Sequence, residues 1–242
     1  MKAMILAAGL GTRLRPLTNN RPKALVEVDG MPLLEIAIRR LKDAGCEGII
    51  VNIHHFGSMI RAFLAQRDFG LPIEISDESG QLLETGGGLK KARGFLDGAQ
   101  SFLMYNADIL SNIDLRKFYE QHNDSGALAT LSVRRRESSR YLVFDERNQL
   151  CGWTNVKTGV LKMSRAKQGV FQFLGFSGIH AIHPAIFELM PSEAAFSIID
   201  LYLQAAHSQK IMAYPHDQDL WLDVGKPEAL KKADVLLRQI ME

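Results

Sequence analysis

The sequence predicts an α/β fold in which helices cover both faces of a mainly parallel sheet. Short apolar runs of strand length alternate with helical patterns in the first half of the chain, and strand-like segments joined by polar turns follow in the middle. With 242 residues, of which 46% are hydrophobic, the chain can bury a sizeable core. Because no repeat or linker-like segment interrupts it, we expect one continuous domain over residues 1–242.

Four apolar runs in the first half are predicted strands, at residues 3–8, 49–53, 72–75 and 102–105. Helical patterns occupy 32–44, 57–66, 114–122, 198–206 and 226–240. In the first helix Leu34, Ile38 and Leu41 recur at helical spacing, and Gly45 follows as a terminator. Strands that alternate with helices in this way pair in parallel, so the core is expected to be a Rossmann-like α/β/α sandwich.

The middle of the chain has a different pattern. Strand-like segments at 127–133, 141–145, 149–153 and 175–182 follow one another with polar turns between them. We therefore expect a small antiparallel extension, which makes the sheet mixed. Open sheets of this kind bind ligands beyond the carboxyl ends of their strands, so informative residues should follow Ala8, Tyr105 and Leu222.

Composition excludes several classes of protein. Lys and Arg number 29 against 27 for Asp and Glu, and a net charge of +2 gives no general attraction to nucleic acid or to a membrane surface. Cys46 and Cys151 lie far apart and form no metal-binding spacing, which favours a reducing cytoplasm. No stretch approaches the roughly 18 apolar residues of a membrane span.

A glycine-rich turn follows the first predicted strand. Gly9 and Gly11 allow the backbone to approach a ligand closely, and consecutive N–H groups in such a turn form an anion site. Arg13 adds a bidentate phosphate donor and Lys23 a mobile positive charge, although a solvated turn is the alternative. Leu14 stands where a dinucleotide fingerprint needs a small residue, which disfavours a dehydrogenase.

Six motifs resemble one known family. They are Leu6-Ala-Ala-Gly-Leu-Gly-Thr-Arg-Leu-Arg-Pro-Leu-Thr18, Arg21-Pro-Lys-Ala-Leu-Val-Glu-Val28, Glu84-Thr-Gly-Gly-Gly88, Tyr105-Asn-Ala-Asp108, Phe176-Ser-Gly-Ile179 and Trp221-Leu-Asp-Val-Gly225. Over nearly its whole length the chain is similar to the sugar-1-phosphate nucleotidylyltransferases. The resemblance implies a transferase that joins a sugar 1-phosphate to a nucleoside triphosphate, uses Mg²⁺ and releases pyrophosphate.

The resemblance also implies roles for individual residues. Arg13 and Lys23 would act on the phosphates, and Asp108 and Asp223 would bind the metal, although aspartates at strand ends also cap loops. The nucleotide-binding part would cover about 1–126, the sugar-binding part about 127–225, and the last helix about 226–242. The expected substrate-binding residues are Leu6, Ala8, Gly9, Leu10, Gly11, Thr12, Thr85, Gly86, Asn106, Ser177 and Gly178.

Departures from the family pattern bear on the choice of substrate. Relatives that read uracil or thymine carry a glutamine where Thr85 stands, and Ala107 replaces a usual glycine. Within the family, the chain resembles short N-acetylmuramate-1-phosphate uridylyltransferases, but Arg140 and Tyr141 stand where that branch has a sugar contact. Alternatives are guanylyl transfer to mannose or heptose 1-phosphate, cytidylyl transfer to choline phosphate, and a non-catalytic regulatory subunit.

The paired histidines and the tryptophans are expected to have structural roles. His54-His55 and the pair His180 and His183 lack a third metal ligand nearby, and Trp153 and Trp221 are expected to pack. The run 134–136 of three arginines is interpreted as a solvated strand end, with contact to a charged sugar as the alternative. The glycines of Glu84-Thr-Gly-Gly-Gly88 are expected to form a loop lying against the base, with a helix beginning near Leu89. Both a monomer and a dimer are compatible with the sequence.

Overall fold

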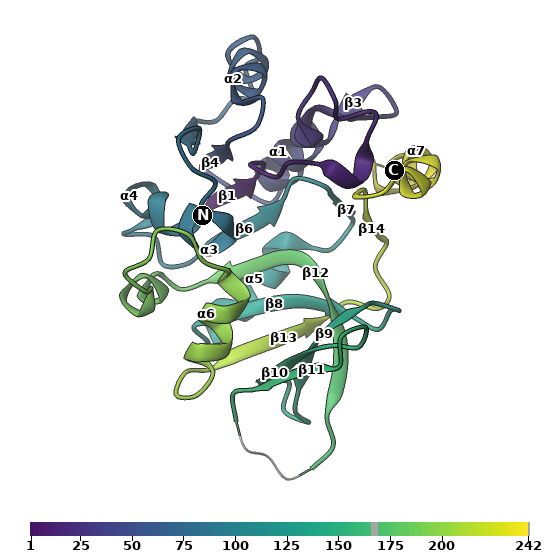
Figure 1. Ribbon diagram of the computed structural model, residues 1–242. Coiled ribbons are helices and arrows are strands. Elements are labelled where there is room, and N and C mark those ends of the chain that lie inside the picture. Colours follow the sequence, from purple (N-terminus) through teal and green to yellow (C-terminus); the bar gives the residue numbers. More distant parts are fainter. Residues whose placement is uncertain (166–168, 242) are drawn as a thin grey trace.

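The computed structural model describes residues 1–165 and 169–241, and a mixed ten-stranded sheet forms its framework (Figure 1). Four strands pair in parallel in the order β6-β1-β4-β5, which confirms the predicted α/β core. Their bounds are β1 Lys2–Leu6, β4 Gly48–Ile53, β5 Ile73–Asp77 and β6 Phe102–Asn106. Since β1 lies between β6 and β4, the loop after β1 is flanked by the ends of two other strands.

One long strand joins the two parts of the sheet. β12, Gln172–Ile182, pairs antiparallel with β6 through its last residues and with β9 through its first residues. Beyond it lie β9 Arg140–Phe144, β10 Leu150–Asn155 and β11 Val160–Met163, which form the expected antiparallel extension. On its other side β12 pairs with β8, Ala129–Arg134.

Two strands of the sheet are absent from the sequence prediction. β13, Ile211–Pro215, lies parallel to β8, and its pairing joins segments far apart in the chain. All four residues of β11 are exposed, so they show no alternation between buried and exposed positions. The periodic pattern that identifies a half-buried strand is therefore missing from β11.

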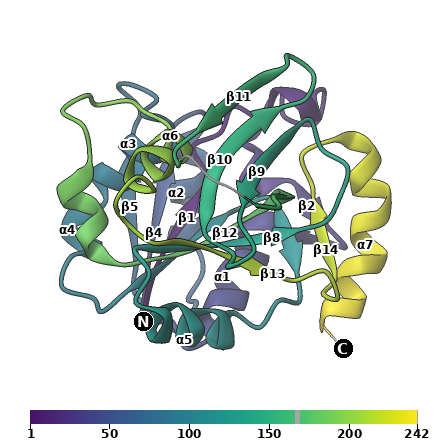
Figure 2. The ribbon, with the colours of Figure 1, turned by 90° about the horizontal axis from the view of Figure 1, so that it is seen from below.

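Helices cover both faces of the sheet (Figure 2). Residues of α3 Glu84–Lys91, α4 Arg93–Leu96 and α6 Ile198–Ala205 belong to one apolar core. The other core contains residues of α1 Leu33–Asp43, α2 Gly57–Ala65 and α5 Leu115–Ser125. α1 begins and ends within one residue of its predicted positions, because its apolar residues recur at helical spacing. α5 begins one residue after its predicted start and extends three residues beyond its predicted end.

A third, smaller core holds the C-terminal helix against the rest of the chain. α7, Pro227–Met241, buries Ala233 and Leu237 beside Leu14 and Leu110. It lies next to a two-stranded sheet of β7 Ile109–Ser111 and β14 Trp221–Asp223, and a second such sheet pairs β2 Glu27–Val28 with β3 Met31–Pro32. Position 242 of the predicted last helix and positions 166–168 of the predicted sugar-binding part lie outside the described residues.

The expectation that three glycines form a loop before Leu89 is wrong. α3 begins at Glu84, and Gly86, Gly87 and Gly88 are buried within it. A Cβ atom at Gly86 would lie 2.8 Å from the Phe196 carbonyl oxygen, and one at Gly88 would lie 2.7 Å from Glu78 Oε1. These glycines therefore allow α3 to pack closely against neighbouring segments, and this packing outweighs their low helix propensity.

Gly87→Ala is expected to lower the melting temperature by roughly 5–10 °C, because its methyl group would overlap the carbonyl group of Ala194. Gly94→Ala is the matched control, since a Cβ atom there has no neighbour within 4 Å. The control should melt at the wild-type temperature or slightly higher. Thermal melts followed by circular dichroism measure both, and equal melting temperatures would contradict the packing argument.

Candidate active site

One pocket opens at the carboxyl ends of the central strands, and a second pocket adjoins it over the extension. The first, of about 450 Å³, lies between the loop after β1 and the start of α3, and we call it the β1 pocket. The second, of about 770 Å³, lies between the extension and the start of α6, and we call it the extension pocket. Arg13 lines both pockets, so they meet at this residue.

The loop after β1 is shaped by Gly11 and anchored by Leu14. Gly11 has φ 65°, a left-handed conformation that glycine adopts without strain, and its carbonyl oxygen accepts a 2.8 Å hydrogen bond from the Thr18 hydroxyl. Leu14 is fully buried in the third core, which explains why a large residue stands there. With Leu14 held inside, the exposed Arg13 beside it is left free to line the pockets.

Asn52 and Glu78 form a buried polar pair behind this loop, and neither is among the site residues predicted from the sequence. Asn52 Oδ1 accepts hydrogen bonds from the N–H groups of Ala7 (2.7 Å) and Ala8 (3.3 Å). Asn52 Nδ2 donates to Glu78 Oε1 at 2.7 Å, and Glu78 Oε2 accepts from the N–H of Leu83 at 3.2 Å. The pair thus ties the loop to the start of α3. The available signal was an asparagine at the end of an otherwise apolar strand.

Strand pairing brings the two predicted metal-binding aspartates together. Asp223 in β14 pairs with Ile109 in β7, and the N–H of Val224 donates to the carbonyl oxygen of Asp108 at 2.9 Å. Lys23, at the start of a 3₁₀ turn over Lys23–Leu25, forms an ion pair with Asp108. Residues from three distant segments of the chain therefore converge at one point.

The side chains of Asp223, Arg13 and Lys23 approach one another closely around Gly225. A Cβ atom at this position would lie 2.5 Å from Asp223 Oδ1, 2.9 Å from an Arg13 guanidinium nitrogen and 3.2 Å from Lys23 Nζ. One carboxylate and two cationic groups therefore surround a single small residue.

The electrostatic environment of Asp223 fits a bound cation. Burial raises the pKa of Asp223 and the charge of Asp108 raises it further, whereas Lys23, Arg13 and Arg136 lower it. Asp223 Oδ1 is buried, and within the described residues it has no hydrogen-bond partner. Two carboxylates, one with an unpartnered oxygen, suit a hard divalent cation that takes its remaining ligands from phosphate or water.

Arg136 is not the solvated residue that the sequence suggested. It is half-buried in the wall of the extension pocket, donates a 2.9 Å hydrogen bond to the carbonyl oxygen of Phe176, and lies 4.9 Å from the ring centroid of Trp221. Burial lowers the pKa of Arg136, and the charge of Asp223 opposes this shift. Arg135 is exposed, so the solvated interpretation holds only for that neighbour.

Most of the site residues predicted from the sequence line a pocket. Asp223 lines the extension pocket, and the residues that line the β1 pocket are Leu6, Ala8, Gly9, Leu10, Gly11, Thr12, Arg13, Lys23, Thr85, Asn106 and Asp108. This placement is compatible with the predicted roles, which remain predictions.

Three predicted substrate contacts, Gly86, Ser177 and Gly178, are absent from the walls of both pockets. The N–H of Gly86 donates to the Phe196 carbonyl oxygen at 2.9 Å. The buried Ser177 hydroxyl lies 2.7 Å from His216 Nε2, and the Ser177 carbonyl oxygen accepts from Trp221 Nε1 at 2.9 Å. Gly86 and Ser177 therefore make contacts within the protein and do not line either pocket.

Among the histidines singled out in the sequence, the buried His180 lies 3.0 Å from the hydroxyl of Tyr202 through Nδ1. Nδ1 of His183 accepts from the N–H of Ala185 at 3.1 Å. Each of these ring nitrogens therefore has a local partner.

The family model described as Nucleotidyl transferase matches residues 2–239. The chain belongs to this family. It is 34% identical to the N-acetylmuramate α-1-phosphate uridylyltransferase of Caulobacter vibrioides, over 98% of this chain and 97% of the relative. It is also 30% identical to the catalytic subunit beta of mannose-1-phosphate guanylyltransferase from Danio rerio, over 94% of this chain but only 62% of that longer protein.

Solved structures show the same fold. The crystal structure of HddC from Yersinia pseudotuberculosis has a TM-score of 0.78 at 24% identity, covering 97% of this chain and 98% of that one. The nucleotidyl transferase resemblance inferred from six motifs is therefore confirmed, as is the fold class. Within residues 1–165 and 169–241, no helix combines the length and the apolar character that crossing a bilayer requires.

Proposed function

We propose that this nucleotidyl transferase moves a nucleoside monophosphate from a nucleoside triphosphate to a sugar 1-phosphate, releasing pyrophosphate and forming a nucleotide sugar. The observation that carries the proposal is the convergence of Arg13, Lys23, Asp108 and Asp223 where the two pockets meet. A reaction between two phosphorylated substrates needs two adjoining binding spaces with cationic groups between them, and this arrangement provides both.

The chemistry demands charge neutralisation and positioning. An oxygen of the sugar phosphate attacks the α-phosphorus of the triphosphate, and the bond from that phosphorus to the bridging oxygen of the leaving pyrophosphate breaks. The attacking oxygen is already ionised, so no general base is required. Lys23 and Arg13 would offset the negative charge that gathers around the α-phosphorus. Mg²⁺ held by Asp108 and Asp223 would supply further charge neutralisation.

The two pockets would divide the substrates between them. The β1 pocket is lined almost entirely by the part of the chain proposed to bind the nucleotide, about residues 1–126, and its glycine-rich loop is of the kind that binds phosphates through backbone N–H groups. The extension pocket is built largely from the proposed sugar-binding part, about residues 127–225. Arg13, which lines both, would then lie between the two phosphorylated ends.

For the substrates themselves, we propose uridylyl transfer to N-acetylmuramate 1-phosphate, supported by the Caulobacter relative that matches over almost its whole length. Guanylyl transfer to mannose or heptose 1-phosphate is the alternative, supported by the mannose-1-phosphate relative. Thr85 stands where relatives that read uracil or thymine carry a glutamine. It lines the β1 pocket, and its hydroxyl accepts a 3.0 Å hydrogen bond from the N–H of Ile198. A non-catalytic subunit is disfavoured, because all four charged residues of the proposed constellation are present.

Pyrophosphate release tests the proposed function. The purified protein is assayed with Mg²⁺ against UTP, GTP, CTP, ATP and dTTP, each combined with N-acetylmuramate, mannose, heptose and glucose 1-phosphates. We expect one dominant pair, containing UTP and N-acetylmuramate 1-phosphate. A dominant pair containing GTP would select the alternative. Nucleotide-sugar binding without pyrophosphate release in any combination would contradict catalysis.

A further inference from the structure

The extension pocket carries more positive than negative charge. Its charged lining residues are Arg13, Arg136, Arg140, Lys162, Asp200 and Asp223, four cationic against two anionic. Lys162 Nζ lies 2.7 Å from Asp200 Oδ1, so these two neutralise each other. Asp223 lies beside Arg13 and Asp108 at the junction with the β1 pocket. Arg136 and Arg140 remain, and within the described part of the chain neither forms an ion pair with a carboxylate.

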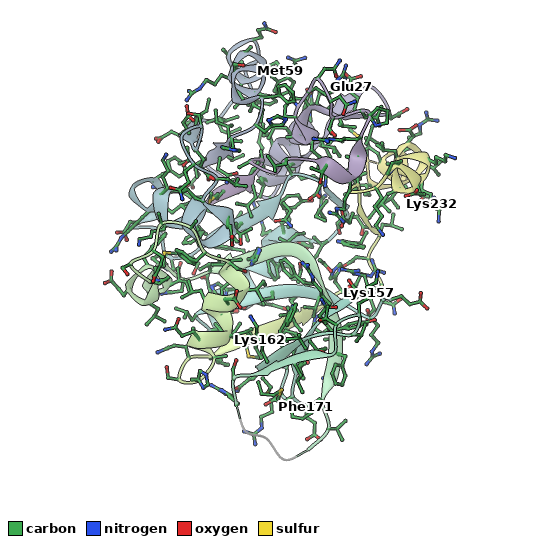
Figure 3. The ribbon with its side chains drawn as sticks, in the orientation of Figure 1. Glu27, Met59, Lys157, Lys162, Phe171 and Lys232 are labelled. Atoms are coloured by element: carbon green, nitrogen blue, oxygen red, sulfur yellow. The ribbon has the colours of Figure 1, made fainter. Side chains whose placement is uncertain are left out.

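Strand register places Arg140 on the pocket side of the extension. Leu142 pairs with Trp153, which pairs with Lys162, so these three side chains form a row across the sheet, and all three line the pocket. Arg140 precedes Leu142 by two residues and therefore shares its face, about 7 Å further along the strand. Figure 3 marks Lys162 on this extension near α6. An apolar floor with a few charged groups at its edge is typical of a small-molecule site.

The segment before Arg140 is fixed by local hydrogen bonds. The Tyr141 hydroxyl accepts from the N–H of Ser138 at 2.9 Å, and the Ser138 hydroxyl accepts from the N–H of Arg140 at 3.2 Å. On the neighbouring strand, Leu174 pairs with Leu142, and two residues later Phe176 accepts the hydrogen bond from Arg136. Arg136 and Arg140 thus approach the same end of the pocket from different segments.

The two arginines differ in their position relative to the reacting groups. Arg136 is half-buried, is close enough to Asp223 to affect its pKa, and has a buried Nε without a partner among the described residues. Its place suits the phosphate that must lie beside Asp223. Arg140 is exposed and lies on the extension, so it would face the remainder of an acceptor whose phosphate lies beside Arg136. The Arg140 guanidinium, which has no carboxylate partner within the described residues, balances one negative charge, and this suits a carboxylate better than a second phosphate of charge about −2.

Resting on the proposed function, we infer that the acceptor is a sugar 1-phosphate bearing a carboxylate on the sugar, and that Arg140 binds this carboxylate while Arg136 binds the 1-phosphate. Arg140 is thereby a specificity-determining residue, which selects acidic sugars over neutral ones. Arg136 contributes equally to the binding of both kinds.

Matched pairs of acceptors test the inference. N-acetylmuramate 1-phosphate differs from N-acetylglucosamine 1-phosphate by one carboxylate-bearing ether group, and glucuronate 1-phosphate differs from glucose 1-phosphate by a carboxylate in place of the C6 hydroxymethyl group. Wild-type enzyme should show higher kcat/KM for the acidic member of at least one pair. Arg140→Gln should lower that value by roughly 10- to 100-fold and change the value for the neutral member less than about 2-fold.

Two further variants separate the roles of the charges. Arg136→Gln should lower kcat/KM for acidic and neutral acceptors by the same factor. Lys157→Gln removes a charge from the turn between β10 and β11, where Lys157 is exposed and outside the lining of the extension pocket, so the preference for acidic acceptors should persist (Figure 3).

The possible failures are distinguishable. Faster turnover of the neutral members by the wild type, or an equal effect of Arg140→Gln on both members, would overturn the inference and leave the proposed function standing. Absence of pyrophosphate release with every acceptor and nucleotide would overturn the proposed function itself, and the inference with it.

Discussion

Asp108→Asn is expected to lower pyrophosphate release by at least about 10³-fold while the protein stays folded. Asparagine has the shape of aspartate and keeps an oxygen that can accept from Lys23, so the packing around this half-buried position is preserved. The negative charge that would hold a divalent cation is lost. Because catalysis of this reaction is mainly charge neutralisation, the loss falls on turnover rather than on stability.

Steady-state kinetics with Mg²⁺ and a thermal melt of the same preparation measure the two effects separately. Asp124→Asn serves as the control, since Asp124 is exposed on α5 and lies outside both pockets. The control should retain wild-type turnover. Full activity in Asp108→Asn, at an unchanged melting temperature, would remove Asp108 from the proposed metal site.

Gly225→Ala is expected to lower kcat/KM by at least about 10²-fold with little effect on stability. Gly225 has no left-handed φ, so the backbone itself accepts alanine. The added methyl group, however, would lie 2.5 Å from Asp223 Oδ1 and 2.9 Å from the Arg13 guanidinium, and these groups must move away. A displacement of about 1 Å among reacting groups is enough to cause a loss of this size.

Gly80→Ala is the matched control for Gly225→Ala, because a Cβ atom at Gly80 has no neighbour within 4 Å. Comparing kcat/KM and the melting temperature of both variants isolates the effect of crowding the charged groups. Wild-type kcat/KM in Gly225→Ala would show that the convergence of Arg13, Lys23 and Asp223 is not required for turnover.

The core of the fold and the glycine-rich loop could be predicted because their signals are local. Apolar residues at helical spacing identify α1. Leu14 by itself disfavours a dinucleotide-binding fingerprint, because the fingerprint needs a small residue at that position. The helical state of Gly86 to Gly88 could not be predicted, because glycine favours loops unless tertiary packing requires a bare backbone. Charge alone predicts a solvated arginine run, and this prediction is wrong at Arg136 because its hydrogen-bond partner Phe176 comes from a distant strand.

Local signals also could not show how the site is supported. Asn52 lies on β4, and Glu78 directly follows β5. Only the parallel pairing of β1 with β4 brings Asn52 within hydrogen-bond distance of Ala7. The same holds for Asp108 and Asp223, whose proximity depends on the pairing of β7 with β14.

The ion pair between Lys23 and Asp108 makes the resting site self-neutralising. Under the proposed function, a phosphate on Lys23 would release Asp108 from this ion pair, and a divalent cation on Asp108 would release Lys23. The affinities for triphosphate and for divalent cation would then be coupled, and each ligand would raise the affinity for the other by the same factor. We therefore expect the site to bind the two ligands together more tightly than either ligand alone.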